Sequence, residues 1–139
     1  MPILELRIGS PSGEHFTIDL PDHPPGGEDW FTADVHISIN CFQGRVSANF
    51  QGSDFPGFRD QLKAMRDTVQ GEAALVPLEG QFEVKLVCNA LGQIAVAGTA
   101  FAMATYGSHL DFEFGIDQTF LAGPLAILEE FLAGDAKSN

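Results

Sequence analysis

The stretch that decides the fold covers residues 34–69 and reads DVHISINCFQGRVSANFQGSDFPGFRDQLKAMRDTV. Apolar and polar residues alternate in its first part, which predicts a strand with one buried face and one exposed face. A turn at 42–44 and a return strand at 45–51 are expected next. From Phe55 the apolar residues recur at helical spacing, which predicts an amphipathic helix that stops at Gly71.

The order of strands and then a helix is expected twice along the chain. Further strands are predicted at 3–8, 15–20, 73–78, 82–88, 93–104 and 110–116, with turns between them that include Asn89–Gly92 and Tyr106–Ser108. A second helix is predicted after Asp117, with Gly134 as its end and 134–139 as a frayed tail. Both helices have a proline in the first turn, a weak sign of a duplicated unit.

These elements predict one α+β domain over residues 1–139. A mostly antiparallel sheet of about six to eight strands is expected, with the two amphipathic helices packed on one face. Eight phenylalanines lie at positions whose spacing points to the core: Phe42, Phe50, Phe55, Phe58, Phe82, Phe112, Phe114 and Phe131. The two cysteines, Cys41 and Cys88, lie in apolar segments and are expected to be buried thiols rather than a disulfide.

The charge of the chain limits the partners that it can bind. Asp and Glu number 19 against 7 Lys and Arg, which gives a net charge of −12. That charge repels nucleic acid and anionic membranes, and it favours either plain solubility or association with a basic partner. No signal peptide and no membrane-spanning segment is predicted, so the expected location is the cytoplasm.

No pattern of catalytic or cofactor-binding residues is found in the sequence. There is no nucleophile elbow, no phosphate-binding glycine loop and no cysteine paired with a histidine signal. The four histidines, His15, His23, His36 and His109, do not have metal-ligand spacing, although His36 and His109 could meet across strands. We therefore predict no catalytic residues, no metal and no cofactor.

Carboxylates on the exposed strand faces form the first candidate binding surface. The residues are Asp34, His36, Glu83, Asp111 and Glu113, which would line a groove if their strands were neighbours. The alternative is a solvated sheet face whose charges discourage edge-to-edge pairing.

The loop from Asp22 to Trp30 is the second candidate surface. Glu28 and Asp29 precede Trp30 there, and an aromatic side chain flanked by carboxylates can be a binding hot spot or a structural anchor for the loop.

A rival prediction is a small-ligand pocket or enzyme site between sheet and helices. Small residues of one strand would leave the space for it: Ala95, Ala97, Gly98, Ala100 and Ala102.

Three segments resemble the WapI family of bacterial immunity proteins. They are the stretch from Leu62 through Gly71-Glu72-Ala73 to Leu86, the stretch Gly92–Gly98, and Leu110-x-Phe112-x-Phe114 followed by Asp117-Gln118-Thr119-Phe120-Leu121. The resemblance covers roughly residues 29–132, and its matched positions are fold markers rather than a catalytic signature.

The resemblance implies a cytosolic inhibitor that is not an enzyme. Such a protein binds and neutralises a cognate toxin domain, and the net charge of −12 suits a basic toxin such as a nuclease. The expected state of the chain is a monomer or a homodimer, with no direct contact to nucleic acid or membrane.

Overall fold

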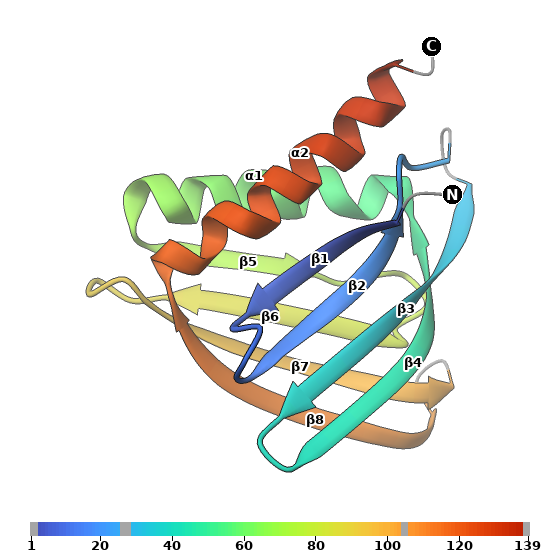
Figure 1. Cartoon of the computed structure of the whole chain (residues 1–139), viewed down its shortest axis with the longest axis horizontal. Coiled ribbons are helices and arrows are strands. Elements are labelled where there is room, and N and C mark those ends of the chain that lie inside the picture. Colours follow the sequence, from blue (N-terminus) through green and yellow to red (C-terminus); the bar gives the residue numbers. More distant parts are fainter. Residues whose placement is uncertain (1–2, 26–28, 104–105, 138–139) are drawn as a thin grey trace.

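The structure is a computed structural model that describes residues 3–25, 29–103 and 106–137. Two helices and eight antiparallel strands form it, so the predicted α+β class is confirmed (Figure 1). Sheet A contains β1 (Ile3–Gly9), β2 (His15–Pro21), β3 (Trp30–Ile39) and β4 (Phe42–Gln51). Sheet B contains β5 (Gly71–Leu75), β6 (Phe82–Cys88), β7 (Gln93–Met103) and β8 (Tyr106–Asp117).

Each sheet is followed by one helix, so the chain repeats a unit of four strands and a helix. The 3₁₀ turn Gly52–Asp54 joins β4 to α1 (Phe55–Thr68), and the 3₁₀ turn Gln118–Leu121 joins β8 to α2 (Ala122–Lys137). Within each sheet the strands lie in sequence order. The strands thus form two sheets where the sequence suggested one, because α1 separates β4 from β5 and each sheet buries its own apolar face.

The core lies between the two sheets and under the two helices. In Figure 1 the strands of sheet A cross those of sheet B obliquely, while α1 lies against β5 and α2 against β1. Phe16 of sheet A packs on Phe82 of sheet B with ring centroids 5.2 Å apart. Phe131 of α2 meets Phe55 of α1 edge-on at 5.4 Å, so aromatic contacts join the sheets and the helices.

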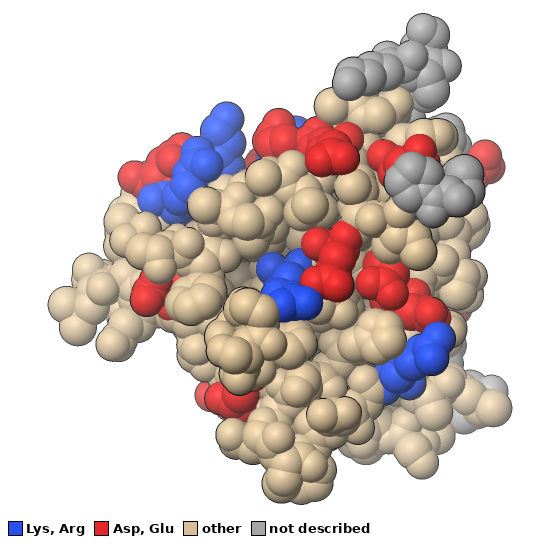
Figure 2. All heavy atoms as spheres, in the orientation of Figure 1, with Lys and Arg blue, Asp and Glu red and all other residues tan. Residues whose placement is uncertain are grey.

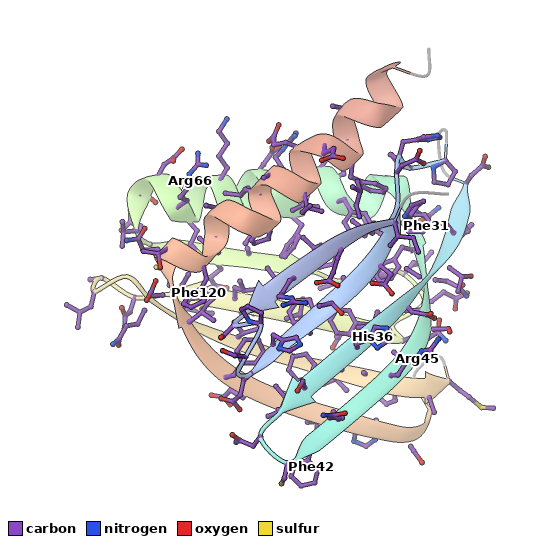
Figure 3. All side chains as sticks on the ribbon, in the orientation of Figure 1. Phe31, His36, Phe42, Arg45, Arg66 and Phe120 are labelled. Atoms are coloured by element: carbon purple, nitrogen blue, oxygen red, sulfur yellow. The ribbon has the colours of Figure 1, made fainter. Side chains whose placement is uncertain are left out.

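The hairpin between β3 and β4 turns two residues earlier than predicted. The turn falls at Asn40 and Cys41, and Asn40 has a positive φ of 49°. Asparagine tolerates that left-handed conformation, so a two-residue turn forms before the glycine at position 44 is reached. In consequence Phe42 is 62% exposed at the hairpin tip (Figure 3) and Cys41 is exposed, both contrary to the prediction, whereas Cys88 is buried.

The ends of both helices also differ from the predictions. Helix α1 ends at Thr68, and its C-cap residue Val69 has a left-handed φ of 54° and donates its N–H to the Met65 carbonyl oxygen at 2.9 Å. Helix α2 passes Gly134 and reaches Lys137. A Cβ on Gly134 would lie 2.6 Å from Cβ of His23, so this glycine permits a close contact rather than ending the helix.

The last hairpin of sheet B differs from the prediction as well. Residues 106–108, expected as a turn, are the first residues of β8. The end of the predicted strand 93–104 and residue 105 lie outside the described residues, and β7 ends at Met103.

Candidate protein-binding surface

The structure divides the predicted acidic surface between two sheets. Asp34 and His36 lie on β3 in sheet A, whereas Glu83 lies on β6 and Asp111 and Glu113 lie on β8 in sheet B. Each sheet turns its apolar side chains toward the common core, so its polar side chains form an outer face. The five residues therefore belong to two separate outer faces, and His36 and His109 do not meet across neighbouring strands.

On the outer face of sheet A, basic side chains lie beside the carboxylates. An acidic row of Glu5, Asp19 and Asp34 runs across β1, β2 and β3, and a basic row of Arg7, His36 and Arg45 runs beside it. Ion pairs join Glu5 to Arg7 and Asp34 to Arg45, the latter at 2.9 Å, and the His36 ring lies 3.5 Å from Asp19. Acidic and basic side chains accordingly lie next to one another on the face seen in Figure 2.

Asp34 is the best-held carboxylate of this face. Arg45 donates a hydrogen bond to Oδ2 at 2.9 Å, and the Ser47 hydroxyl donates to Oδ1 at 3.0 Å. These two bonds lower the pKa of Asp34 below its usual range, with Arg45 as the larger cause. Asp34 is thus fixed as an anion by groups of its own sheet.

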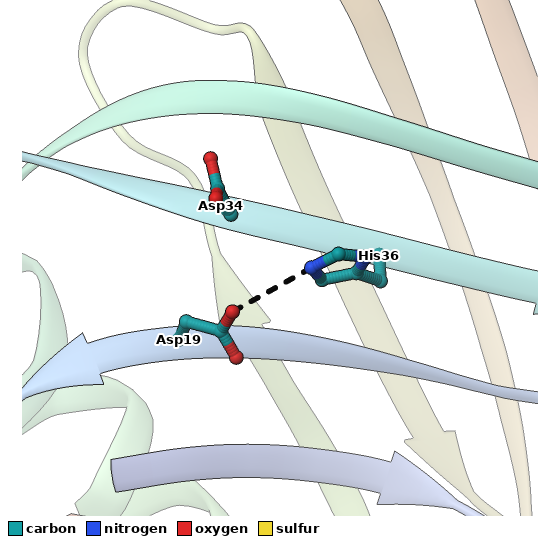
Figure 4. Close-up of side chains that lie close together, drawn as sticks. All are labelled: Asp19, Asp34 and His36. Atoms are coloured by element: carbon teal, nitrogen blue, oxygen red, sulfur yellow. Dashed lines mark ion pairs between the residues drawn. The ribbon is translucent and has the colours of Figure 1, made fainter. Parts of the chain in front are cut away.

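Asp19, Asp34 and His36 form a group that the sequence patterns did not reveal (Figure 4). One ligand atom from each lies within 4.8 Å of the others, so the group has the donor atoms of a small cation site. Both oxygens of Asp34 already accept hydrogen bonds, and Arg45 places a positive charge beside them. The group is therefore satisfied by neighbouring side chains without an ion. The only sequence signal for Asp19 was its alternation with Ile18 and Leu20.

On the outer face of sheet B, carboxylates far outnumber basic side chains. Five carboxylates lie on it against one lysine: Glu72, Glu83, Asp111, Glu113, Asp117 and Lys85. Lys85 pairs with Glu72 at 2.9 Å. Among the described residues, the side chains of Glu83 and Glu113 have neither an ion pair nor a hydrogen bond. Sequence reasoning found three of these carboxylates and missed Glu72 as well as Asp117.

Two carboxylates of this face do have local polar partners. Asp111 accepts a hydrogen bond from the Thr99 hydroxyl at 2.8 Å and lies 3.8 Å from the His109 ring. Asp117 caps the turn before α2, because it accepts hydrogen bonds from the Thr119 hydroxyl and from the Thr119 N–H. Those bonds, the hydroxyl first, lower the pKa of Asp117. Neither carboxylate is paired with a lysine or an arginine of the described residues.

An apolar row crosses sheet B next to these acids. Val87 of β6, Ala95 of β7 and Gly115 of β8 lie side by side and are exposed, and Val87 has 41% of its surface accessible. Phe120, which is 37% exposed, lies at the end of the same open hollow of about 850 Å³. Sequence reasoning missed this row, because alanine and glycine carry little signal of a surface.

The second candidate surface is only partly described. Glu28 lies outside the described residues. Asp29 is exposed and Trp30 is 43% exposed at the start of β3. Phe31 instead packs inward against Phe50 and stacks on Phe55 (Figure 3). Phe31 is therefore the structural anchor of this segment, and Trp30 remains available at the surface.

The Phe112 ring fills the space at Gly98 that the rival prediction of an internal pocket requires, whereas Ala100 and Ala102 line an open hollow of about 540 Å³ beside β4. A Cβ on Gly98 would lie 2.5 Å from the Phe112 ring, so that ring fills the gap that the glycine leaves. Ala100 is buried in the core, and Ala95 and Ala97 are exposed on the outer face of sheet B. The hollow that contains Glu83, Asp111 and Glu113, of about 450 Å³, opens outward on that face.

In the part of the chain that the structure describes, no helix is long and apolar enough to cross a bilayer.

The fold and surface define a two-sheet α+β protein with acidic side chains on both open sheet faces. The immunity protein WapI-like family has a model that matches residues 7–134, and the chain belongs to that family. This membership supports a toxin-neutralising role through binding of a toxin protein, and it suggests an inhibitor that is not an enzyme.

Sequence and structure comparisons add only a fold relation. No curated protein matches the chain significantly. Among solved structures it is similar to a chain from the crystal structures of MRP1/MRP2 of Trypanosoma brucei, with a TM-score of 0.54 and 8% identity over 99% of this chain and 88% of that one. At that identity the similarity shows a shared fold alone.

Proposed function

We propose that this protein is a cytoplasmic immunity protein that neutralises one cognate toxin domain by binding it through an acidic surface. The match to the WapI-like family over residues 7–134 is the observation that carries the proposal. Binding alone can inhibit a toxin, so the function needs no catalytic residues in this chain.

The partner that the charge favours is a basic toxin domain, with a nuclease as the leading class. A nuclease must attract phosphates, so its active-site cleft is basic, and carboxylates can occupy the same positions as phosphates. The net charge of −12 also attracts a basic partner over a distance and raises the rate of association. A monomer or homodimer of this chain is expected, which light scattering would test.

Co-expression tests the proposed function directly. The toxin domain encoded next to this gene would be expressed in a bacterial host with and without the full chain. We expect growth arrest with the toxin domain alone and normal growth when both are present. Continued growth arrest in cells that contain the folded protein at high level would refute the proposal.

A further inference from the structure

We propose that the outer face of sheet B, and not that of sheet A, is the surface that docks the toxin domain. The inference rests on the proposed function and names the part of the molecule that performs it. The partner surface that fits this face has basic side chains next to an apolar side chain. Charge, surface shape and exposed apolar area each support this choice.

The two outer faces differ in how their carboxylates are paired. Glu5 and Asp34 of sheet A each have an arginine within ion-pair distance on their own face, and Asp19 lies 3.5 Å from the His36 ring. Glu83 and Glu113 of sheet B have none among the described residues, and the one lysine of that face is paired with Glu72. Unpaired carboxylates on a rigid sheet attract a basic partner. The charge of a paired carboxylate is largely cancelled by its neighbour, so it attracts a partner less.

The second argument comes from the small residues at the centre of sheet B. Ala95 and Ala97 are exposed on the central strand β7, and Gly115 is exposed beside them on β8. Alanine and glycine are poor strand formers, so their presence on a solvated strand does not serve the sheet itself. They leave a low floor between the longer side chains, on which the side chains of a partner can lie.

The third argument is the exposed apolar material around that floor. Val76, Val87 and Phe120 are 63%, 41% and 37% exposed and lie along the two hollows of this face. Exposed apolar side chains next to charged ones are typical of protein-binding surfaces. On sheet B, Val87 lies in the row of Ala95, four residues along β6 from Glu83, and Val76 lines the hollow that contains Glu83 and Asp111.

The distance between the acidic rows and the apolar row of Ala95 sets the spacing of side chains expected on the partner. Thr99, which lies between Glu83 and Asp111, is four residues from Ala95 on β7, a separation of about 13 Å along the strand. Glu113 pairs with Ala97, two residues or about 7 Å from Ala95, so a partner that fits has arginine or lysine about 7 to 13 Å from an apolar side chain on one surface. A second copy of this chain does not fit, because two such faces would bring carboxylates against carboxylates.

Two charge variants of the full chain test the inference against an inactivated form of the toxin domain encoded next to this gene. In Glu83→Lys/Glu113→Lys we expect the dissociation constant to rise at least about tenfold, since like charges then face the basic partner. The control is Asp60→Lys/Asp67→Lys on α1, which changes the net charge equally at two exposed sites. Less than about a threefold change is expected in the control, because these sites lie away from the interface.

A pair of steric variants tests the face without a change of charge. Ala95→Trp fills the low floor of sheet B, and Gln43→Trp adds the same side chain at an exposed position of sheet A. Both are expected to fold, as circular dichroism would show, and only Ala95→Trp should abolish binding.

The possible outcomes separate the two proposals. If the wild type does not bind the toxin domain, the proposed function fails and this inference fails with it. If the wild type binds and the sheet B variants bind equally well, only the inference is overturned. An equal loss of binding in the α1 control would assign the effect to net charge and overturn the inference too.

Discussion

At Gly98 the absence of a side chain decides how sheet B packs. An added Cβ would lie 2.5 Å from Cζ of Phe112 and 2.7 Å from the carbonyl oxygen of Glu83. Gly98→Ala should therefore lower the free energy of unfolding by about 1–3 kcal/mol, the usual cost of overpacking a core. Urea unfolding followed by circular dichroism measures this change.

Gly57→Ala in α1 is the matched control for Gly98→Ala. No atom outside the helix lies within 4 Å of a Cβ built on Gly57. Alanine has the better helix propensity, so this variant should be more stable than the wild type by up to about 1 kcal/mol. Equal stability of Gly98→Ala and the wild type would show that the Phe112 ring can move aside without cost.

A second prediction at the residue scale concerns Asp34 and acid. Arg45 and Ser47 lower the pKa of Asp34 in the folded state, so their bonds stabilise the fold above the ordinary aspartate pKa. That stabilisation is lost as the pH falls through the lowered pKa, below about pH 4. Arg45→Ala should raise the pKa of Asp34 toward its usual value, as an NMR titration of the carboxyl carbon would show.

The control for Arg45→Ala is Arg66→Ala, which removes an arginine that pairs with Asp67 on α1. It should leave the titration of Asp34 unchanged. If the Asp34 titration is the same in Arg45→Ala and in the wild type, the ion pair across β3 and β4 is absent in solution.

At the scale of elements, glutamine side chains protect two sheet edges. Gln61 of α1 accepts a hydrogen bond from the Ala74 N–H of β5 at 2.9 Å, and Gln81 accepts from the Asn49 N–H of β4 at 3.1 Å. Gln61→Ala should cost about 1 kcal/mol of stability and speed hydrogen exchange at the Ala74 amide. Exchange measured by NMR checks both effects.

Gln70→Ala is the comparison for the edge-strand prediction. Gln70 is exposed just after α1, and among the described residues its side chain has no hydrogen bond. Its replacement should leave exchange at Ala74 unaltered. If Gln61→Ala also leaves that rate unaltered, α1 shields the edge by its backbone and not through the glutamine.

Most elements could be predicted because their signals are local. Strands β3 and β6 show strict alternation, and α1 has Phe55, Phe58 and Leu62 at helical spacing, all of them buried. The turns were less predictable, because several residues nearby can adopt turn conformations. Gly44 suggested the hairpin turn, yet Asn40 adopts the positive φ and the chain reverses there.

At the scale of the whole molecule, one core should make the two halves unfold together. The buried cluster contains residues of both sheets and both helices, and Phe16 of the first half packs on Phe82 of the second. We predict a single cooperative thermal transition for the full chain, with equal calorimetric and van't Hoff enthalpies. Two separated transitions would contradict the expectation of one domain over residues 1–139.

Salt should slow association of the whole molecule with its toxin. The net charge of −12 acts over a distance, and between about 0.1 and 1 M salt the Debye length falls from about 10 Å to about 3 Å. Stopped-flow mixing should therefore show an association rate that falls as salt rises, with a smaller change in the dissociation rate. A rate that is independent of salt would exclude steering by charge.

The sequence by itself determined the properties that depend on near neighbours along the chain. Alternation along β3 placed Val35 and Ile37 inside and left Asp34 and His36 outside, and the net charge follows from composition alone. The tertiary structure decided which strands are neighbours, and hence that Asp34 finds Arg45 while Glu83 and Glu113 find no basic partner within the described part of the chain. Such pairing depends on sheet order and register, which arise when distant segments pack together, and a local pattern of residues carries no record of that packing.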